Sequence, residues 1–564
     1  MQIWTEGGRG SLRGKLPRIE VNAYPLYETR PVETVKDLFN YPLENTPDKD
    51  VFRVRKSKDS YEGISWKQFK EDVDALGTAL YARGFKGQHL CVMGDNMYEW
   101  VLVYMTALCG DMVIVPLDKD LPAPQIEQLI RFADGTALFY TPKYEQIARA
   151  VRENLPEVKL VCDVRGEGPG SMSELLEEGR RLLASGDVSY TSETPAKDKM
   201  AALLYTSGTS GQPKGVMLSQ DNIVSSFDGA CKNLSFGEDD VMLSVLPLHH
   251  AYESNCGILA MLHTSTVVCF NENLKLLMPN MQLFKPTGMG VVPLILDTLY
   301  KQMRDAGRRS GLTEEVLASM PPEQAKEAQA KLAAGARQAV GGRMHKGFVG
   351  GAAMNPEILG KLRQVGLNFP QGYGITECSP LVSINRDHQY KDSSVGLPSP
   401  SNEVRIEDGE IQVRGRNVML GYYKDPQATK EAFTEDGWFR TGDLGYIDEE
   451  GFLFITGRKK NLIILESGEN ISPEELERNI AGRDLIKEIV VMEDNGRITA
   501  HIYPDYEYAK AAHITDIKDA LDKIVAEVNA AQPRYKHIAD VKVHETEFEK
   551  TTTKKIKRHT VGKG

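Results

Sequence analysis

A short stretch near residue 210 combines small hydroxyl residues, glycines and one lysine, the groups from which phosphate-binding loops are built. Residues 204–215 read LYTSGTSGQPKG. Glycine lets the main chain approach a bulky anion, backbone N–H groups and hydroxyls donate hydrogen bonds, and lysine adds a point charge. The stretch is not a Walker A motif, because Lys214 is followed by Gly215 instead of Ser or Thr. An apolar run at 201–205 predicts a buried strand leading into the loop, which argues against a solvated linker. The loop therefore predicts a polyphosphate site.

Residues 371–377, QGYGITE, offer a different set of groups. The glycines free the backbone, Tyr373 presents an aromatic face, and Thr376 and Glu377 add a hydroxyl and a carboxylate. This set suits an adenine beside a phosphate and a Mg²⁺ ion, since Mg²⁺ prefers oxygen ligands. Taken alone, the run also fits an ordinary turn.

A third region consists of 437–445, GWFRTGDLG, followed by 454–460, FITGRKK. It contains Asp443, and an aspartate can accept hydrogen bonds from both hydroxyls of a ribose. The alternative is a carboxylate that caps its own Thr-Gly-Asp turn. The residues alone leave both interpretations open.

Two further motifs also allow more than one interpretation. Residues 551–558, TTTKKIKR, form a basic tail that could bind RNA or acidic lipid. Residues 246–253, LPLHHAYE, place His249 and His250 side by side, where neutral imidazoles could line or gate a pocket. A metal site is the alternative for this pair, but no other His, Cys or Asp cluster in the chain has the spacing of metal ligands.

The segments that would position these motifs alternate between strand and helix. Strand–helix–strand units with short turns indicate a parallel sheet in an α/β layer. Asp95 or Asn96 is a candidate N-cap for the first of the helices. Apolar periodicity predicts strands at 88–93, 113–116, 137–141, 241–245, 266–270 and 289–292, helices at 97–108 and 124–132, and two surface helices within 301–340 around Pro321-Pro322.

The pattern of predicted strands and helices changes beyond Arg440. Runs at 488–492 and 497–503 flank Asn495-Gly496, and Asn-Gly is a strong hairpin signal. Apolar residues at helical spacing follow in 517–528, and 541–544 predicts another strand. The end of the chain is therefore expected to form a small α+β unit.

Composition narrows the class of protein. The chain has 564 residues, 41% of them hydrophobic, so more than one folding unit is expected. A net charge of −11 argues against a general nucleic-acid binder. Seven scattered cysteines without a CxxC pair favour reduced, buried thiols and a cytoplasmic location. No signal peptide and no membrane-spanning run are recognisable, while peripheral membrane contact stays open.

Taken together and in this order, the motifs resemble those of the adenylate-forming enzymes: acyl- and aryl-CoA synthetases, luciferases and the adenylation domains of peptide synthetases. The resemblance extends from about Val51 to Arg558. It implies an α/β fold with a large N-terminal domain of layered sheets and helices, residues 1–458. A small mobile α+β C-terminal domain, residues 459–564, would carry the catalytic lysine.

The resemblance also implies a role for each motif. Tyr373 would stack on adenine, Thr376 would contact phosphate and Glu377 would hold Mg²⁺, while Asp443 would bind the ribose. Lys555 would bridge the carboxylate and the α-phosphate during adenylation; Lys554 stands where many members have glycine. His250 would lie beside the carboxylic acid, and Lys460 would be the hinge. The implied nucleotide-binding residues are Thr206, Ser207, Gly208, Thr209, Ser210, Lys214, Gly351, Ala352, Ala353, Gln371, Gly372, Tyr373, Gly374, Ile375, Asp443, Ile455 and Arg458.

The implied activity is that of an ATP-dependent acyl-CoA synthetase, with ATP, Mg²⁺ and CoA as cofactors and co-substrates. No aspartate occurs at 248–252, where amino-acid-activating members carry one, so a plain carboxylic acid is favoured. Residues 457–464 and 467–473 and the helical insert at 301–340 resemble those of long-chain synthetases, which implies medium- or long-chain fatty acids as substrates. The residues at 256–261 could line a tunnel or be core. The alternatives are a fatty acyl-AMP ligase serving a carrier protein and a non-catalytic nucleotide-sensing protein of the same fold. A monomer or a homodimer is expected.

Overall fold

The computed structural model describes residues 26–206, 213–309, 316, 319–464, 470–494, 496–550 and 556–562. Within these residues a seven-stranded sheet carries the predicted alternation of strand and helix. Strand β3 pairs in parallel with both β4 and β5, which confirms the parallel layer. In sheet order the strands are β18 (Gly421–Tyr422), β8 (Lys214–Ser219), β7 (Met200–Thr206), β4 (Val113–Pro116), β3 (His89–Met93), β5 (Gly135–Tyr140) and β6 (Leu160–Asp163).

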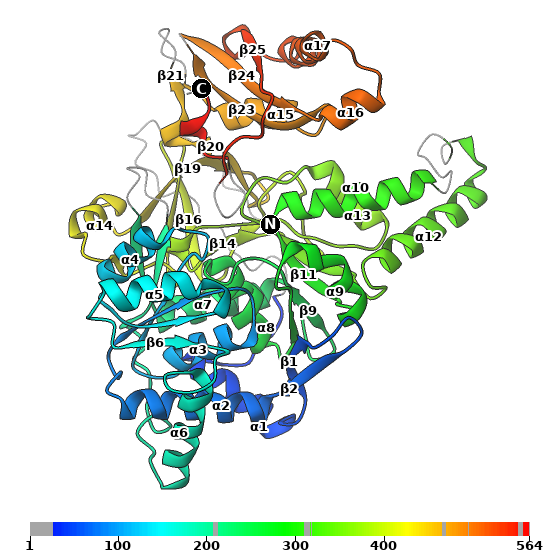
Figure 1. The fold of residues 1–564 in the computed structure, drawn as a ribbon. Helices are drawn as coiled ribbons and strands as arrows, with labels where there is room; N and C mark the ends of the chain where they lie inside the picture. Colours follow the sequence, from blue (N-terminus) through cyan, green and yellow to red (C-terminus); the bar gives the residue numbers. More distant parts are fainter. Residues whose placement is uncertain are drawn as a thin grey trace, which may run out of the picture.

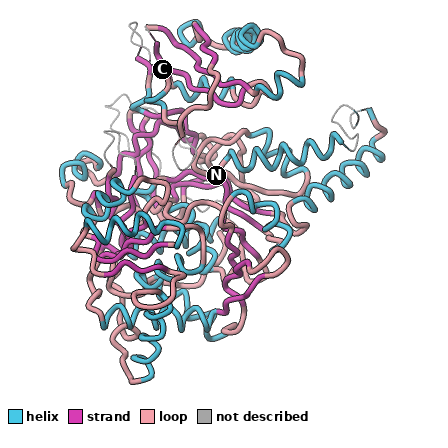
Figure 2. Tube along the Cα trace, viewed as in Figure 1, coloured by secondary structure: helices cyan, strands magenta, loops and turns pink. Residues whose placement is uncertain are grey.

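Helices cover both faces of this sheet (Figures 1 and 2). Successive residues of a strand point to opposite faces, and in β3 the side chains of Cys91 and Met93 join the cluster under α4 and α5, whereas Leu90 and Val92 join the larger core on the other side. The helices around the sheet are α2 (Trp66–Ala82), α3 (Tyr98–Leu108), α4 (Ala123–Phe132), α5 (Glu145–Asn154), α6 (Met172–Ala184) and α7 (Gln220–Asn233).

The predicted cap of α3 is wrong. Met97 is the N-cap residue, and no side chain caps this helix end. Asp95 pairs with Lys119 and accepts a hydrogen bond from Tyr144, and the Asn96 amide donates to the Leu246 carbonyl at 2.7 Å. Both polar side chains thus bind neighbouring segments instead of the helix terminus.

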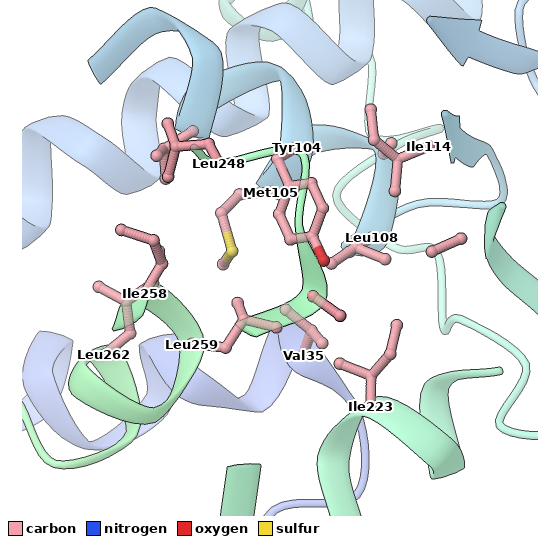
Figure 3. Packing of buried hydrophobic residues seen from close by; sticks show 14 of the residues in the cluster. Val35, Tyr104, Met105, Leu108, Ile114, Ile223, Leu248, Ile258, Leu259 and Leu262 are labelled. Atoms are coloured by element: carbon pink, nitrogen blue, oxygen red, sulfur yellow. The ribbon is translucent and has the colours of Figure 1, made fainter. Parts of the chain in front are cut away.

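A second, six-stranded sheet lies on the far side of the main core within the described residues. Figure 3 shows part of that core, where Tyr104, Met105 and Leu108 of α3 face Ile258, Leu259 and Leu262. The strands, in sheet order, are β12 (Lys346–Val349), β11 (Gly288–Val291), β9 (Val241–Ser244), β10 (Val267–Phe270), β1 (Asp50–Arg55) and β2 (Tyr61–Ser65); the helices around it are α1 (Asn40–Asn45), α8 (Ala260–His263), α9 (Leu277–Phe284), α10 (Pro293–Arg309), α12 (Pro322–Ala339) and α13 (Pro356–Gln364).

The helices α10 and α12 form an arm that projects from the body (Figure 1). They match the two helices predicted around Pro321-Pro322, except that α10 begins earlier than expected. The first turns of α10 are also partly buried, whereas a surface helix was predicted. Leu296 and Leu299 are buried in the cluster that covers the second face of the six-stranded sheet.

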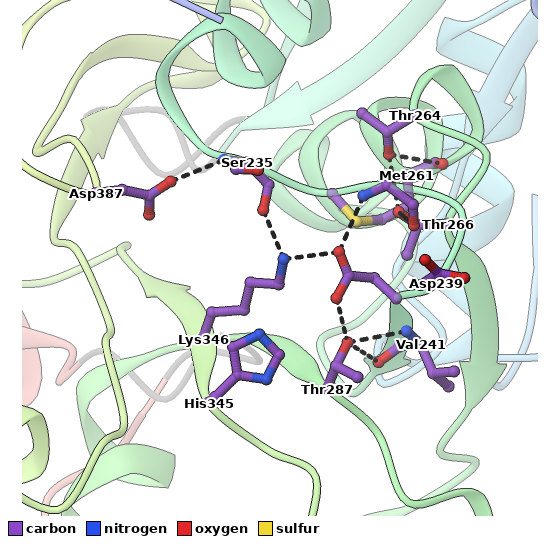
Figure 4. Close-up of polar contacts among 12 residues, drawn as sticks. Ser235, Asp239, Val241, Met261, Thr264, Thr266, Thr287, His345, Lys346 and Asp387 are labelled. Atoms are coloured by element: carbon purple, nitrogen blue, oxygen red, sulfur yellow. Dashed lines mark hydrogen bonds and ion pairs between the residues drawn. The ribbon is translucent and has the colours of Figure 1, made fainter.

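Polar contacts fix one end of that sheet (Figure 4). The Lys346 ammonium group at the start of β12 donates to Asp240 and to the Ser235 carbonyl, both at 2.7 Å. Asp240 in turn accepts a hydrogen bond from Thr287 at 2.8 Å. Because Lys346 begins β12, while Asp240 and Thr287 directly precede β9 and β11, the three strands start from one ion-paired network.

Smaller sheets follow in the chain. One consists of β13 (Gly372–Gly374), β14 (Leu381–Ile384) and β15 (Leu397–Pro398). Another consists of β16 (Asn402–Glu407), β17 (Glu410–Gly415), β19 (Phe439–Ile447) and β20 (Leu453–Arg458), and α14 (Pro426–Ala432) precedes β19 in the chain.

The last part of the chain lies above the rest in Figure 1 and has its own hydrophobic core. The predicted hairpin is confirmed as the antiparallel pair β23–β24, which β25 joins in parallel. The elements are β21 (Ile463–Ile464), β22 (Asn470–Ile471), α15 (Pro473–Ile480), β23 (Ile486–Asp494), β24 (Arg497–Pro504), α16 (Tyr506–Ala511), α17 (Ile517–Ala530) and β25 (Asp540–Val543). The small α+β unit is therefore present as expected.

Two further expectations can be compared with the structure. All seven cysteines are free and buried. In the described part of the chain, no helix is both long and apolar enough to span a bilayer.

Candidate active site

The phosphate loop is flanked by a hairpin. Strand β7 ends at Thr206 and β8 begins at Lys214, and these two residues pair across the antiparallel ladder. The buried strand predicted to lead into the loop is confirmed as β7. Ser207, Gly208, Thr209 and Ser210 lie outside the described residues, so their role as phosphate ligands stays a prediction. The Lys214 Nζ atom lies 4.5 Å from the centre of the Tyr422 ring.

The second motif folds into β13 and the short 3₁₀ helix η6 (Thr376–Cys378). Gly374 needs to be glycine, because a Cβ atom there would lie 2.3 Å from the Pro380 carbonyl oxygen. The Ile375 N–H donates to that same oxygen at 2.9 Å. Gln371 is buried, and its carbonyl accepts the Asn385 N–H. The turn that presents Thr376 and Glu377 is thus set by main-chain packing.

Three residues from separate motifs meet at one point. The Tyr373 hydroxyl donates to Asp443 Oδ2 at 2.6 Å, and Arg458 Nε donates to Asp443 Oδ1 at 2.6 Å. Asp443 and Arg458 are paired residues of β19 and β20. Burial raises the pKa of Tyr373, and the Asp443 charge raises it further, so the phenol stays a donor. Burial lowers and Asp443 raises the pKa of Arg458, with a net rise.

Glu377 lies at the other end of the motif. Its Oε1 atom accepts a hydrogen bond from the Tyr422 hydroxyl at 2.9 Å, and its carbonyl accepts the Met419 N–H at 2.8 Å. The Thr376 hydroxyl and the Glu377 carboxylate are hard oxygen donors of the kind Mg²⁺ prefers, so these residues fit the ion that the family motif implies. The sequence does not reveal Tyr422, since nothing in GYY at 421–423 marks it as part of a site.

An apolar cavity opens onto this nucleotide motif. It encloses about 680 Å³, including the space at its mouth. Gly350, Gly351 and Tyr373 are among the residues that line it, and the walls are almost entirely apolar. Ala352 and Ala353 follow Gly351 as exposed residues, and Ile455 is partly buried on β20. The remaining lining residues are Ala230, Cys231, Leu234, Phe236, Tyr252, Cys256, Ala260, Met261, Phe348, Val349, Gly372, Gly374, Pro380, Leu381 and Ile384.

The stretch expected to be either tunnel or core is both. Cys256, Ala260 and Met261 line the cavity, whereas Ile258 and Leu259 face the core shown in Figure 3. Most of the stretch belongs to a π-helix, η4 (Tyr252–Leu259). The wider π turn is a form often found at functional sites.

The paired histidines precede this π-helix. Their ring centroids are 4.1 Å apart. Burial, together with the nearby Lys119 charge, lowers the pKa of His249 to about 3, so this imidazole is neutral at pH 7. His250 is not among the described residues that line the cavity, and its contact with the acid stays a prediction. In the described ranges no group of three or more His, Cys, Asp or Glu side chains is arranged to hold a metal ion.

The residues expected to move lie at the domain junction. Lys460 is exposed on a 3₁₀ turn, η7 (Lys459–Asn461), directly after Arg458. Lys555 lies outside the described residues, but Lys550 and Ile556 on either side of its segment pair with each other. Arg558 donates to the Val491 carbonyl at 2.8 Å and pairs with Glu477. The hinge and the catalytic lysine stay predictions.

Comparison with known proteins gives consistent matches. The model of the family described as AMP-binding enzyme matches residues 39–423, and the model described as AMP-binding enzyme C-terminal domain matches residues 460–563. The long-chain-fatty-acid–CoA ligase FadD15 of Mycobacterium bovis is 30% identical over 454 residues, which covers 76% of this chain and 75% of the relative. The human long-chain-fatty-acid–CoA ligase 1 is 29% identical over 84% of this chain and 74% of its own length.

Solved structures share the fold. The adenylation domain of a carboxylate reductase from Mycobacterium chelonae superposes with a TM-score of 0.78 at 18% identity, over 95% of this chain and 90% of that domain. ATP-bound MatB from Rhodopseudomonas palustris gives a TM-score of 0.74 at 22% identity, over 94% of this chain and 98% of that one. At these identities the likeness supports the architecture alone.

Proposed function

The chain belongs to the AMP-binding enzyme family, and from that premise we propose that it is an ATP-dependent acyl-CoA synthetase for medium- or long-chain fatty acids. The acid would be activated as an acyl-adenylate and then transferred to CoA. The relatives named as long-chain-fatty-acid–CoA ligases, 27–30% identical to this chain, support the substrate class.

One observation carries the proposal. The apolar cavity is lined both by the glycines and the tyrosine of the nucleotide motif and by the apolar side chains of Cys231, Leu234 and Phe236. An alkyl chain in such a cavity leaves water, at a gain of about 0.8 kcal/mol per methylene group. Because the nucleotide motif contributes to the same wall, the carboxylate of such an acid would lie within the cavity that borders the expected ATP site, which is the arrangement that joining the two molecules requires.

The proposed reaction has two displacements. A carboxylate oxygen attacks the α-phosphorus of ATP, the bond from that phosphorus to the bridging oxygen breaks, and pyrophosphate leaves. The sulfur of CoA then attacks the acyl carbon, the carbon–oxygen bond to AMP breaks, and the thiol proton passes to solvent. No side chain of the protein forms a covalent bond with either substrate.

The protein therefore works by positioning and by charge. When the acid and ATP are held in line, a reaction between two free molecules becomes a step within one complex. This is one of the largest contributions that an enzyme makes to the rate. Lys214, Arg458 and Lys555 are the cations proposed to face the phosphates, and Asp443 the group that receives the ribose. Thr376 and Glu377 would hold Mg²⁺, which supplies positive charge to the phosphate oxygens when bound.

A fatty acyl-AMP ligase that serves a carrier protein shares the first displacement and is the alternative. A panel of carboxylic acids, from acetate to long-chain fatty acids and including benzoate and an amino acid, separates the candidates. We expect AMP release that depends on both a fatty acid and CoA. Acyl-AMP that accumulates whether or not CoA is present would instead support the ligase, and no reaction with any acid would support a nucleotide-sensing protein.

A further inference from the structure

Tyr422 contacts two charged groups that come from different motifs. Its hydroxyl donates to Glu377 Oε1 at 2.9 Å, and the Lys214 ammonium lies 4.5 Å from its ring centre. The first group is proposed to hold the metal ion, and the second to contact the phosphates of ATP. The tyrosine is 8% exposed, so both contacts are shielded from solvent.

The position of this tyrosine is fixed from outside the site. Strand β18 pairs with β8 so that Tyr422 lies opposite Val216, two residues beyond Lys214. The Tyr422 N–H donates to the Thr429 hydroxyl at 2.8 Å. Gly421 has φ +144°, and a Cβ atom there would lie 2.7 Å from a Thr429 side-chain carbon. The pairing with β8 thus fixes the ring beside Lys214.

The same segment also holds the turn that carries the carboxylate. The Met419 N–H donates to the Glu377 carbonyl at 2.8 Å, and the buried Asn417 amide donates to the Cys378 carbonyl at 3.0 Å. Backbone and side chain of the carboxylate residue are therefore both bound by 417–422, which makes the segment a single support for the metal side of the site.

The phenol also separates two opposite charges. The Lys214 ammonium lies over the ring and the Glu377 carboxylate accepts a hydrogen bond from the hydroxyl, so the two opposite charges contact different parts of one side chain. The ammonium on the ring face and the carboxylate at the hydroxyl are kept apart.

We propose that Tyr422 is a positioning residue that holds the Lys214 ammonium and the Glu377 carboxylate apart, so that ATP and Mg²⁺ are received together in one geometry. This inference rests on the proposed function for the identity of the ligand. It assigns Tyr422 no contact with the reacting atoms.

Two variants separate the two contacts, and ATP binding measured by calorimetry is the readout. Tyr422→Phe keeps the ring and removes the hydroxyl, so ATP affinity without Mg²⁺ should stay near that of the wild type. The Mg²⁺ concentration needed for half of the maximal gain in ATP affinity should rise about tenfold, the order expected for losing one hydrogen bond to a charged group. Tyr422→Leu should also weaken ATP binding without Mg²⁺ by several-fold, because the cation–π contact is lost.

Tyr423→Phe is the matched control. Its hydroxyl donates to Asp134 at 2.6 Å, away from the site, and should leave both titrations unchanged. An unchanged Mg²⁺ dependence in Tyr422→Phe, or an equal shift in Tyr423→Phe, would overturn the inference. If the wild type binds ATP with Mg²⁺ but releases no pyrophosphate with any acid, the proposed reaction is wrong, while the binding titrations still decide the role of Tyr422.

Discussion

The carboxyl group of Glu253 is 1% exposed inside the π-helix that lines the cavity. Burial raises its pKa to about 8, although the Ser244 hydroxyl and the Leu246 N–H both hydrogen-bond to it. It fits only beside a glycine, since a Cβ atom on Gly257 would lie 2.7 Å from the carboxyl carbon. At pH 7 this group is therefore a neutral acid in the folded protein.

This state makes the stability of the protein depend on pH. The unfolded carboxyl has its ordinary pKa of about 4.3, so between that value and about 8 the folded state binds more protons than the unfolded state. The contribution of Glu253 should fall by roughly 1 kcal/mol per pH unit as the pH rises through this window. Glu253→Gln keeps an acceptor oxygen and cannot ionise, so only the wild type should lose this stability as the pH rises. The Tm of the variant minus the Tm of the wild type should therefore increase from pH 5 to pH 8. A constant difference across that range would show that Glu253 is not buried as a neutral acid.

The sequence motifs singled out three residues that lie together in the structure, and their contact with a nucleotide stays a prediction. Tyr373, Asp443 and Arg458 lie far apart in the sequence, yet hydrogen bonds join them in the structure. Tyr422 could not be found in this way, because its importance comes from a two-residue strand that pairs with β8. A tyrosine next to a glycine carries no local signal of such a partner.

At the scale of elements, η4 and the start of α8 form the cavity wall that should set acyl chain length. Cys256 and Ala260 are small, which leaves room for an alkyl chain between this wall and α7. Ala260→Phe would fill part of that room. We expect the preferred acid to become shorter by several carbons, with longer acids losing about a factor of three or more per excluded methylene group, since each is worth about 0.8 kcal/mol.

Rates with a panel of even-numbered acids test this expectation. Activity with the shortest acids that the wild type accepts is the internal control, because these acids would not reach Ala260. A uniform loss at every chain length would mean that the substitution damages the fold instead of shortening the cavity.

Periodicity predicted most elements of the α/β layer, because short buried strands and amphipathic helices alternate between 88 and 141. It did not predict that the strands divide between two sheets, since pairing partners such as β1 and β10 are more than two hundred residues apart. The π-helix was also missed. Its residues 253–255 are polar yet fully buried, with Asn255 donating to the Ser379 carbonyl at 2.6 Å, and a helix-period pattern gives no sign of this.

At the scale of the whole molecule, polar contacts join the C-terminal unit to the body, among them the Ser472 hydroxyl, which donates to the Thr456 carbonyl at 2.6 Å. Arg304 on α10 pairs with Asp484 at 3.2 Å, and the Lys459 ammonium contacts Glu410 at 3.2 Å. The pair of Arg304 and Asp484 is partly exposed and stabilises the interface only weakly, whereas Glu410 is buried. The predicted movement of this unit about Lys460 would have to change these contacts.

The hinge prediction concerns two half-reactions. Proline fixes φ near −65°, so Lys460→Pro should restrict the change that a hinge requires. We expect this variant to form acyl-AMP but to make the thioester far more slowly. Lys555→Ala should do the reverse, with almost no acyl-AMP from ATP but useful turnover of added acyl-AMP with CoA. Parallel losses of both half-reactions in each variant would argue against domain alternation about Lys460.

The central claim is that a fatty acid carboxylate attacks the α-phosphorus of ATP in the cavity described above. The most direct test follows the carboxylate oxygen. With a long-chain fatty acid labelled with ¹⁸O in its carboxyl group, plus ATP, Mg²⁺ and CoA, the account predicts that one labelled oxygen per turnover appears in AMP, because that oxygen stays on phosphorus when CoA attacks the acyl carbon. Label in inorganic phosphate with ADP as the second product, or AMP without label, would contradict it.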